Sequence, residues 1–374
     1  MTSHETYDIA VVGGGIVGSA VAAEAAGRGA RVVLVDRADG PSPASTRSFA
    51  WLNAVSSDSP HYRGLRVLGV QRHLLEHARW GSGSPYRFTG SLSWAREGAL
   101  EPTQGAAGAV GIEELHRRDH AAGGAARLIG REEAVRIEPS LGDVPHDGPF
   151  LHSSDEGWVD LPDLVGELRR RLVRAGGVVV RTAVELSADG GRVRLEGGPC
   201  AETVVIAAGA QTPALLSALG VGIPEATSGA AILVADGLGS APRGILRTGG
   251  ISARSHGGGA LVLHSTALDA FVDPDGPRHL LPGERVDEVA AAAAEAFGWE
   301  RPPRVLRALA GARPVPGDGL PVVGSVAGYE NLRVAFTHSG ATLGLLLGDL
   351  LASELVAGEA DGVLSPYRPG RFSA

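Results

Sequence analysis

Hydrophobic and polar positions at the start of the chain follow the order of one strand–helix–strand unit. A mostly apolar run at residues 7–12 predicts a buried strand, and the alanine-rich stretch 15–27 predicts a helix. A second apolar run, at residues 31–35, ends at Asp36. This order is that of a βαβ unit with a carboxylate at the end of its second strand.

Between the first strand and the helix, Gly13, Gly15 and Gly18 stand at G-x-G-x-x-G spacing. The first glycine permits a tight turn, the second lets N–H groups approach a pyrophosphate, and the third lets the helix pack on the strand. The positive end of the helix dipole favours the pyrophosphate, and Asp36 suits the hydroxyls of an adenosine ribose. An ordinary strand-to-helix turn is the alternative. The predicted dinucleotide contacts are Gly13, Gly15, Ile16, Val17, Gly18 and Asp36.

The rest of the chain alternates segments of helical and strand periodicity. Helices are predicted at residues 62–80, 112–120, 161–175, 286–297 and 341–356, with another opening within 128–134. Strands are predicted at residues 88–94, 178–180, 184–186, 192–195, 203–206, 231–235, 245–253, 260–265 and 332–336. The helix 62–80 has a predicted apolar face made of Leu65, Leu68, Leu75 and Ala78.

A segment with loop composition, residues 37–48, is rich in Ser, Pro, Gly and Asp. Ser45, Thr46 and Arg47 concentrate hydroxyls and a guanidinium there, where they would hold phosphates or face a ring system. A solvated loop with a helix cap explains the same residues.

Two later turns also favour a ligand close to the backbone. Ala207, Ala208 and Gly209 follow the strand 203–206, and small residues at the end of a parallel strand leave room for a ligand. Residues 337–340 introduce the last helix, whose first N–H groups have no intrahelical partner. His338 in this turn would add a hydrogen-bond donor, or serve only in structural hydrogen bonding.

Length and charge narrow the class of protein. A chain of 374 residues, 44% hydrophobic and 20% charged, fits a two-domain globular enzyme. The net charge of -8 argues against a general affinity for nucleic acid or anionic lipid. The cluster of basic residues on the predicted helix 161–175 is interpreted as its solvated face; it comprises Arg169, Arg170, Arg171 and Arg174.

Cysteine usage and the terminal sequence favour a cytoplasmic protein. Cys200 is the single cysteine, which excludes an intrachain disulfide and fits a reducing compartment. Residues 1–5 are polar and lack the basic and apolar parts of a signal peptide. Uncharged apolar stretches fall short of the length of a membrane span, so we expect no span.

With these segments in order, the chain resembles the FAD-dependent oxidoreductases of the D-amino acid oxidase family, which includes glycine oxidase and monomeric sarcosine oxidase. The resemblance covers nearly the whole length. It rests on the glycine motif with Asp36 and on Asp155-Glu156-Gly157-Trp158-Val159-Asp160, Val205-Ile206-Ala207-Ala208-Gly209-Ala210, Gly311-Ala312-Arg313-Pro314, Asp318-Gly319-Leu320-Pro321 and Thr337-His338-Ser339-Gly340.

The resemblance implies an α/β fold with a Rossmann-like FAD-binding domain and a discontinuous antiparallel-sheet substrate domain of α+β type. The FAD-binding domain would be assembled from residues 1–85, 151–215 and 312–374. The substrate-binding domain would comprise residues 86–150 and 216–311.

The resemblance also implies residue roles at the cofactor. Thr46 and Arg47 would touch the flavin and pyrophosphate, Val184 the adenine side, and Ala208 and Gly209 the second dinucleotide contact. The remaining implied cofactor contacts are Arg37, Ser45, Arg313, Ser339, Gly340, Ala341 and Thr342, in addition to the residues of the glycine motif.

Arg313 matches the arginine that anchors a substrate carboxylate in members that oxidise amino acids, although a structural ion pair is an alternative. With His338 and Arg47 it completes the set of predicted catalytic residues. The implied reaction moves a hydride from the carbon bearing nitrogen to flavin N5 and leaves an imine, and most of this chemistry belongs to the cofactor. The implied partners are an amine or amino acid substrate and oxygen or another electron acceptor.

Three departures from the family pattern matter. Asp36 replaces the usual glutamate, and a shorter carboxylate still accepts from ribose. The family's cysteine for covalent attachment is missing, so the FAD should be dissociable. The chain contains no lysine, so the lysine that some members place near N5 is also missing; Arg47, Arg254, His256 or His264 would substitute electrostatically, unless oxygen is not the acceptor.

Other classes are less well supported by the sequence. We predict no metal site, because the flavin needs none, and no Ser/His/Asp hydrolase, because a Gly-x-Ser-x-Gly elbow is missing. Two alternatives stay open: a flavin-dependent tailoring oxidation or desaturation of a natural-product intermediate, and a flavin-bearing component of a larger complex. The substrate, its stereochemistry, the acceptor and the oligomeric state are not determined by one sequence.

Overall fold

The protein was analysed as a computed structural model that describes residues 6–38, 42–54, 59–95, 111–144, 146–239, 241–275 and 281–372. The chain forms two compact units. Unit 1 comprises residues 1–46, 160–227 and 313–374, and unit 2 comprises residues 47–159 and 228–312. The division predicted from the sequence, into an FAD-binding and a substrate-binding domain, has its boundaries after residues 85, 150, 215 and 311. It stays a prediction. The prediction that residues 1–5 are not part of a signal peptide falls on residues outside those that the structure describes.

Unit 1 is built on a six-stranded sheet in the order β18-β19-β12-β1-β2-β9. All neighbours pair in parallel except β18 and β19, which are antiparallel. The strands are β1 (Tyr7–Val12), β2 (Val32–Asp36), β9 (Val178–Arg181), β12 (Ala201–Ile206), β18 (Val322–Ser325) and β19 (Leu332–Phe336). Continuous apolar runs such as Val32 to Val35 are buried throughout, as expected for parallel strands covered on both faces.

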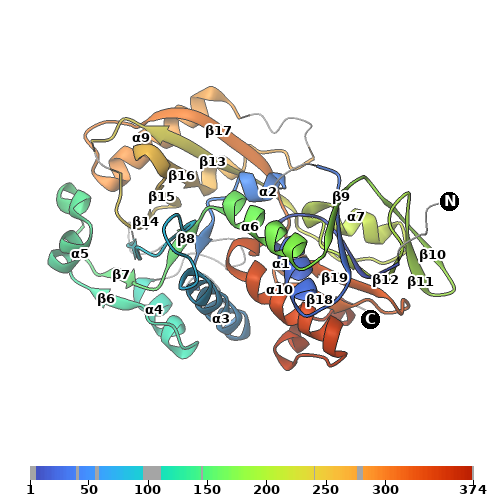
Figure 1. The fold of residues 1–374 in the computed structure, drawn as a ribbon. Helices are drawn as coiled ribbons and strands as arrows, with labels where there is room; N and C mark the ends of the chain where they lie inside the picture. The colour runs from blue at the N-terminus through green and yellow to red at the C-terminus, as the bar shows by residue number, and fades with distance from the viewer. Residues whose placement is uncertain are drawn as a thin grey trace. The chain divides into compact units, whose positions relative to one another are not determined.

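Three helices of unit 1 pack together beside this sheet, with α1 (Ile16–Gly27) against both α6 (Leu161–Arg174) and α10 (Gly340–Ala357) (Figure 1). Small residues permit the close approach of α1 and α10. A Cβ atom on Gly348 would lie 2.5 Å from the Ala20 Cβ, and one on Gly344 would lie 2.7 Å from Ile16 Cγ1. Only glycine at these positions lets the two helices pack this closely.

Helix α10 also has the length and apolar character of a membrane span, which the sequence analysis overlooked. It is 18 residues long with a mean hydropathy of 1.5, but half of it is buried inside the structure. A helix in the core of a folded unit can have the same length and hydropathy, and α10 packs on α1 as a core helix does.

A hairpin completes unit 1, as the sequence predicts. Strands β10 (Glu185–Asp189) and β11 (Arg192–Glu196) pair antiparallel. The turn between them uses Gly190 and Gly191, both at positive φ, which is the conformation of a tight hairpin turn. Short helical segments of this unit are α2 (Pro43–Thr46), α7 (Thr212–Ser217), and turns of 3-10 helix at Gly209–Gln211, Gly362–Tyr367 and Pro369–Phe372.

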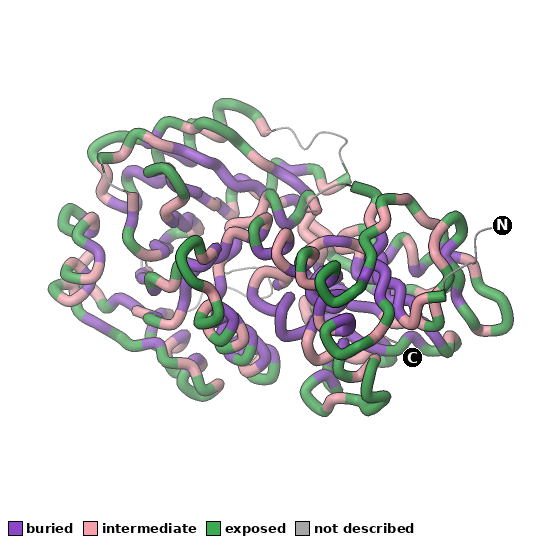
Figure 2. The backbone as a smooth tube through the Cα atoms, viewed as in Figure 1, coloured by how far each residue is buried: buried purple, intermediate pink, exposed green. Residues whose placement is uncertain are grey.

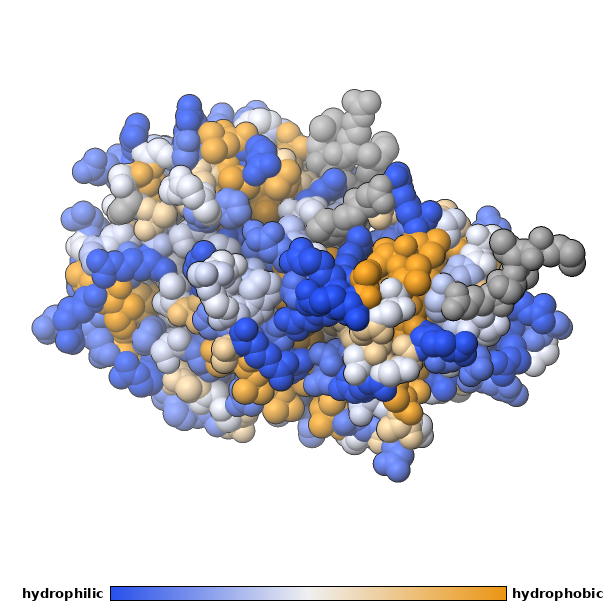
Figure 3. All heavy atoms as spheres, in the orientation of Figure 1, coloured by the Kyte–Doolittle hydropathy of each residue, from blue (hydrophilic) through white to orange (hydrophobic). Residues whose placement is uncertain are grey.

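The edge strand of this sheet carries exposed apolar side chains. Val178 and Val179 of β9 and Val173 at the end of α6 are all exposed. Apolar atoms accordingly gather over β9 in Figure 3.

Unit 2 is built on an eight-stranded sheet in the order β17-β13-β16-β15-β14-β5-β7-β6, accompanied by a three-stranded sheet β3-β8-β4. The large sheet contains β5 (Ser91–Ser93), β6 (Arg127–Ile129), β7 (Phe150–Ser153), β13 (Ser228–Asp236), β14 (Ile245–Thr248), β15 (Ile251–Ser255), β16 (Leu261–Ser265) and β17 (Arg304–Arg313). The small sheet contains β3 (Trp51–Leu52), β4 (Tyr86–Arg87) and β8 (Gly157–Val159). The helices are α3 (Pro60–His77), α4 (Ile112–Ala121), α5 (Arg131–Ile137), α8 (Thr266–Asp269) and α9 (Gly283–Phe297), with 3-10 turns at Pro139–Asp143 and Gly257–Gly259.

One face of the large sheet forms the apolar core of unit 2. Leu92, Leu246 and Leu263 point to this face and pack with Phe297 of α9. Buried backbone accordingly follows the central strands of the sheet in Figure 2. The opposite face carries polar side chains, which are described below.

Several sequence predictions need correction. The predicted strand 245–253 is the two strands β14 and β15, because Gly249 and Gly250 adopt positive φ and reverse the chain. The predicted loop 37–48 contains the short helix α2. Residues 128–129 of the predicted helix start 128–134 belong to strand β6, and helix α5 begins only at Arg131. The other strands and α-helices that were not predicted are β3, β4, β7, β8, β17, β18, α7 and α8. On α3, Leu65 is buried but Leu68 and Leu75 are 41% and 64% exposed, because the helix buries polar residues instead.

Candidate cofactor and substrate sites

The predicted cofactor contacts of unit 1 gather at one edge of its sheet. Strands β19, β12, β1 and β2 are parallel neighbours, so their carboxyl ends meet. Gly13 follows β1, Asp36 ends β2, Ala208 follows β12, and Ser339 follows β19. The carboxyl edge of an open parallel sheet is where α/β proteins bind their ligands.

The glycine turn is closed to any larger residue. Gly13 has φ +109°, and a Cβ atom there would lie 2.4 Å from the Ala207 carbonyl oxygen. A Cβ atom on Gly18 would lie 1.9 Å from the Gly13 carbonyl oxygen. The Ala207 N–H donates to Val12 O at 2.8 Å, which fixes the two strand ends side by side. These contacts agree with the roles that the sequence assigns to the first and third glycine.

Two helix N-termini meet at this edge. Helix α1 begins at Ile16 and α10 at Gly340, and a Cβ atom on Gly340 would lie 3.2 Å from Ile16 Cγ2. The first N–H groups of each helix, at Val17 and at Ala341 and Thr342 among others, have no acceptor within their own helix. Together the two positive dipole ends form a site for an anion.

Hydroxyl groups cover the glycine turn. A Cβ atom on Gly15 would lie 2.9 Å from Ser42 Oγ and 3.8 Å from Ser45 Oγ, and these two hydroxyls are 3.2 Å apart. Thr46 Oγ1 donates to Pro43 O at 3.0 Å, so it caps its own turn. The sequence analysis missed Ser42, whose position just before the proline at the start of α2 is a common signal for a helix cap.

The other predicted contacts of unit 1 vary in burial. Arg37 is exposed just beyond β2, and Val184 and Ala208 are half-buried against the core below the sheet. Gly209 opens a 3-10 turn after β12. Ser339 is buried at the start of α10, and its N–H donates to Thr337 Oγ1 at 3.2 Å.

Asp36 and the basic helix α6 meet beneath the turn, which corrects the interpretation of Arg169 as part of a solvated face. The Arg169 side chain is only 16% exposed, and its guanidinium lies 3.1 Å from Asp36 Oδ2. Arg170 and Arg174 do face solvent, at 62% and 64% exposure, and pair with Glu167.

The predicted catalytic residues are distributed over both units. Arg47 lies in unit 2, where its Nη1 donates to Ala310 O at 2.8 Å and holds the segment after α2 against β17. Arg313 is the last residue of β17 and is half-buried, and His338 is half-buried in the turn before α10. The structure describes each unit by itself, so the joint action of these three residues stays a prediction.

The sheet face of unit 2 opposite its apolar core carries polar side chains on β5, β14, β15 and β16, and we call it the polar sheet face. The buried apolar residues Ile232, Val234 and Val262 share this face. Ser93 pairs with Arg247 across β5 and β14, Arg247 with Ser252, and Ser252 with His264. Residues directly opposite one another in paired strands project to the same face of the sheet. Arg254, two residues beyond Ser252, also projects to this face. The sequence analysis missed Arg247, whose signal is its place between Leu246 and Thr248 in an otherwise apolar strand.

Aromatic side chains cover part of this polar face. The Arg254 guanidinium lies 4.2 Å from the Trp158 ring centre and 5.4 Å from that of Phe49, and its Nε donates to Phe49 O at 2.7 Å. His264 contacts Phe49 as well, and its Nε2 lies 3.0 Å from Asp269 Oδ2. Two of the predicted substitutes for the missing lysine, Arg254 and His264, therefore lie on one surface.

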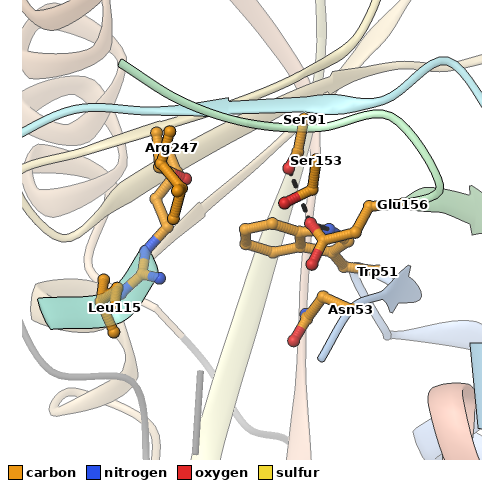
Figure 4. Close-up of a pocket in the computed structure, with 9 residues that line it drawn as sticks. Trp51, Asn53, Ser91, Leu115, Ser153, Glu156 and Arg247 are labelled. Carbon is orange, nitrogen blue, oxygen red and sulfur yellow. Dashed lines mark hydrogen bonds between the residues drawn. The ribbon is translucent and has the colours of Figure 1, made fainter. Parts of the chain in front are cut away.

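A small pocket opens on the same face, and Figure 4 shows its polar lining. Its volume for water-sized occupants is about 10 Å³, enough for roughly one water molecule. The lining residues are Trp51, Asn53, Ser91, Ser93, Leu115, Leu151, Ser153, Glu156 and Arg247.

Glu156 is the acidic residue in the lining of this pocket. It accepts hydrogen bonds from Ser91 Oγ at 2.6 Å, Trp51 Nε1 at 3.0 Å and the Ala54 N–H at 3.2 Å. Burial raises the pKa of Glu156 to about 7, against the opposing hydrogen bond from Ser91. Burial lowers the pKa of Arg247 to about 10, so Arg247 remains a cation at neutral pH.

Two histidine pairs lie at helical spacing in unit 2. His73 and His77 lie four residues apart on α3, and His116 and His120 do so on α4. Among the described residues, no group of three or more His, Cys, Asp or Glu side chains is placed to hold a metal ion.

Comparisons with known proteins identify the family. The model of the DAO family, described as FAD dependent oxidoreductase, matches residues 8–354. The glycine oxidase of Geobacillus kaustophilus is 25% identical over 384 residues, covering 96% of each chain. An opine oxidase component of Rhizobium meliloti is 24% identical over 382 residues, covering 98% of each chain.

Solved structures share the fold. The crystal structure of the G. kaustophilus glycine oxidase matches with a TM-score of 0.82 at 23% identity, over 99% of this chain and all of that one. Iminodiacetate oxidase from Chelativorans sp. BNC1 matches with a TM-score of 0.78 at 20% identity, over 96% of this chain and 98% of that one. The predicted fold class, a Rossmann-like domain with an antiparallel-sheet domain, is confirmed.

The residues at the carboxyl edge of unit 1 fit the cofactor of this family. The turn at Gly13 and Gly18 excludes side chains, the N-termini of α1 and α10 suit the anionic pyrophosphate, and Asp36 suits the ribose. Since the family model spans almost the whole chain, the protein belongs to the DAO family of FAD-dependent oxidoreductases and is a flavoenzyme.

Proposed function

We propose that this enzyme oxidises the C–N bond of an amino acid or a secondary amine that bears a carboxylate, giving an imine. The observation that carries the proposal is the polar sheet face of unit 2, where the cations Arg247 and Arg254 are buried and Arg254 lies against the Trp158 and Phe49 rings. Such a face suits a small charged substrate better than it suits an apolar substrate. The names of three similar proteins, which are oxidases of glycine, iminodiacetate and an opine, point to the same substrate class.

The bound FAD would supply the hydride-accepting N5 atom, held without a covalent link. We assign substrate anchoring to Arg313, whose planar guanidinium can pair with a carboxylate through two parallel hydrogen bonds. Holding the carboxylate fixes the neighbouring C–H bond in one orientation, which is the main contribution that side chains make to such a reaction.

The start of α10 would supply the second electrostatic element. The first N–H groups of α10, at Gly340, Ala341 and Thr342, together with the positive dipole end of the helix, favour negative charge nearby. His338 would add a hydrogen-bond donor beside them. Arg47, held on β17 through Ala310, would contribute a fixed positive charge in place of the missing lysine.

The test combines flavin reduction with substitution of Arg313. Under anaerobic conditions, amino acids, N-methyl amino acids and cyclic imino acids should bleach the visible flavin absorbance of the purified holoenzyme. Arg313→Ala should weaken the apparent affinity for a reactive amino acid about 100-fold, since two charge-assisted hydrogen bonds are lost. Matched amines without the carboxylate should be unaffected. Arg307→Ala, which removes an exposed arginine of the same strand, is the control and should behave as wild type.

The proposal is overturned if no carboxylate-bearing amine reduces the flavin, or if Arg313→Ala leaves the affinity unchanged. Reduction only by a larger biosynthetic intermediate would favour the tailoring alternative. Reoxidation by air after complete reduction would identify oxygen as an acceptor, and slow reoxidation would favour another acceptor.

A further inference from the structure

Arg169 of α6 lies directly behind the glycine turn. Its Nη2 donates to the Gly14 carbonyl oxygen at 2.7 Å and to Asp36 Oδ2 at 3.1 Å. The fit is close, because a Cβ atom on Gly14 would lie 2.2 Å from that nitrogen. One guanidinium nitrogen therefore joins the turn after β1 to the acid that ends β2.

The hydrogen bonds of Asp36 leave a defined acceptor for a ligand. Its Oδ2 accepts from the Gly14 N–H at 2.9 Å as well as from Arg169, and its Oδ1 accepts from the Ala38 N–H at 3.2 Å. A carboxylate has about four acceptor positions. Donors among the described residues occupy three of them, and with respect to these residues the remaining position is on Oδ1, where one ribose hydroxyl can donate.

The ion pair between Asp36 and Arg169 is largely buried. The side chains of Asp36 and Arg169 are 12% and 16% exposed, so the charges are only partly screened by water. Removing Arg169 would leave the Asp36 carboxylate with two backbone N–H donors and without its cation. The short aspartate would then be free to turn away from the ribose position.

We propose that Arg169 is a positioning residue for the adenosine half of FAD, which holds Asp36 and the Gly14 peptide in the geometry that accepts a ribose hydroxyl. The proposal concerns cofactor retention and is independent of the substrate. It also explains how an aspartate can bind the ribose at the position where the family usually has the longer glutamate. Arg169 holds the Asp36 carboxylate by its Oδ2 and so directs Oδ1 to the ligand.

The experiment measures FAD binding to apoprotein by quenching of flavin fluorescence. Arg169→Met, which keeps the aliphatic stem and removes the guanidinium, should raise the FAD dissociation constant at least 10-fold. Arg170→Met removes an exposed arginine of the same helix and should change it less than 3-fold. Arg169→Lys, which retains a positive charge, should recover part of the lost affinity.

A second measurement distinguishes positioning from a general loss of structure. ADP should compete with FAD better than 2′-deoxy-ADP or 3′-deoxy-ADP does in wild type, and this preference should disappear in Arg169→Met. The double variant with Asp36→Asn should bind FAD no more weakly than the weaker single variant.

Equal FAD affinity in Arg169→Met and wild type would overturn the proposal. So would a retained preference for ADP in Arg169→Met, or multiplicative effects in the double variant. Circular dichroism and thermal unfolding establish that each variant is folded, and Arg169→Gln replaces Arg169→Met if the latter does not fold, with the same expected results.

Discussion

The buried carboxyl of Glu156 makes the stability of unit 2 depend on pH, and Glu156→Gln is the substitution that tests it. Glutamine keeps the size of the side chain but cannot ionise. One of its ends is an NH₂ group, so one of the N–H or O–H donors from Trp51, Ala54 and Ser91 loses its acceptor. At low pH this loss should cost the variant about 1–3 kcal/mol.

The magnitude follows from the pKa. Burial holds the pKa of Glu156 at about 7 in the folded protein, against its ordinary value of 4.5. A tenfold change in proton affinity corresponds to about 1.4 kcal/mol, so the free energy of unfolding contains a pH-dependent part of about 3 kcal/mol. The folded state binds more protons than the unfolded state between these two pKa values. Wild-type stability should therefore fall as the pH rises from about 4.5 to 7 and stay reduced above that range.

The assay compares thermal unfolding of wild type and Glu156→Gln from pH 4.5 to 8.5, followed by tryptophan fluorescence. The Tm of the variant should lie below that of wild type at pH 4.5, and the difference should shrink or reverse by pH 8.5. A cooperative unit of 150–250 residues shifts by about 2–4 °C per kcal/mol, so the change in the difference should be about 6 °C or more.

Glu167→Gln on α6 is the control. Burial is opposed there by hydrogen bonds from Arg174 and Arg170, which lower the pKa of Glu167 below its ordinary value. Its contribution is complete above pH 4.5, so this variant should show a constant Tm difference over the same range. If Glu156→Gln also shows a constant difference, the carboxyl is already ionised in the folded protein and the reasoning is refuted.

Two further predictions concern the packing of unit 1. Gly348→Ala should destabilise the protein by about 1–3 kcal/mol, because the new Cβ would lie 2.5 Å from the Ala20 Cβ. The control is Gly27→Ala, because a Cβ atom at Gly27 would extend into open space. Equal Tm values for the two variants would contradict the close packing of α1 and α10. Asn331→Ala should cost about 2–4 kcal/mol in chemical denaturation, because Val193 N–H and C=O lose their partners at 2.8 and 3.0 Å. Asn331→Asp should cost at least as much, because it buries a charge and sets a carboxylate oxygen against the Val193 carbonyl. An unchanged midpoint for Asn331→Ala would refute the role of this bridge.

The sequence by itself determined the nucleotide-binding half of the fold. Strand β1, the glycine turn and helix α1 are consecutive, so local periodicity and turn chemistry fix them without reference to the rest of the chain. The same is true of β19 and the start of α10. Parallel pairing then brings these consecutive segments to one sheet edge, which is where the motif predicts that FAD binds.

Long-range contacts were decided only by the tertiary structure. Arg169 has the same sequence surroundings as Arg170, and only the packing of α6 on α1 turns one toward Asp36 and leaves the other in water. Leu68 and Leu75 have the spacing of core residues, yet α3 buries His73 and Glu76 instead. His73 pairs with Tyr86 of β4, and Glu76 accepts a hydrogen bond from Trp80 just beyond the helix.

The chemistry of the polar sheet face was likewise hidden from the sequence. Glu156 and Arg247 are 91 positions apart in the chain, and each alone resembles an ordinary charged residue. Their meeting in one pocket depends on the pairing of β14 with β5, a contact between distant segments that no local pattern encodes. Sequence patterns report local conformation and which faces are apolar, whereas the burial and the partners of a charge are properties of the assembled sheet.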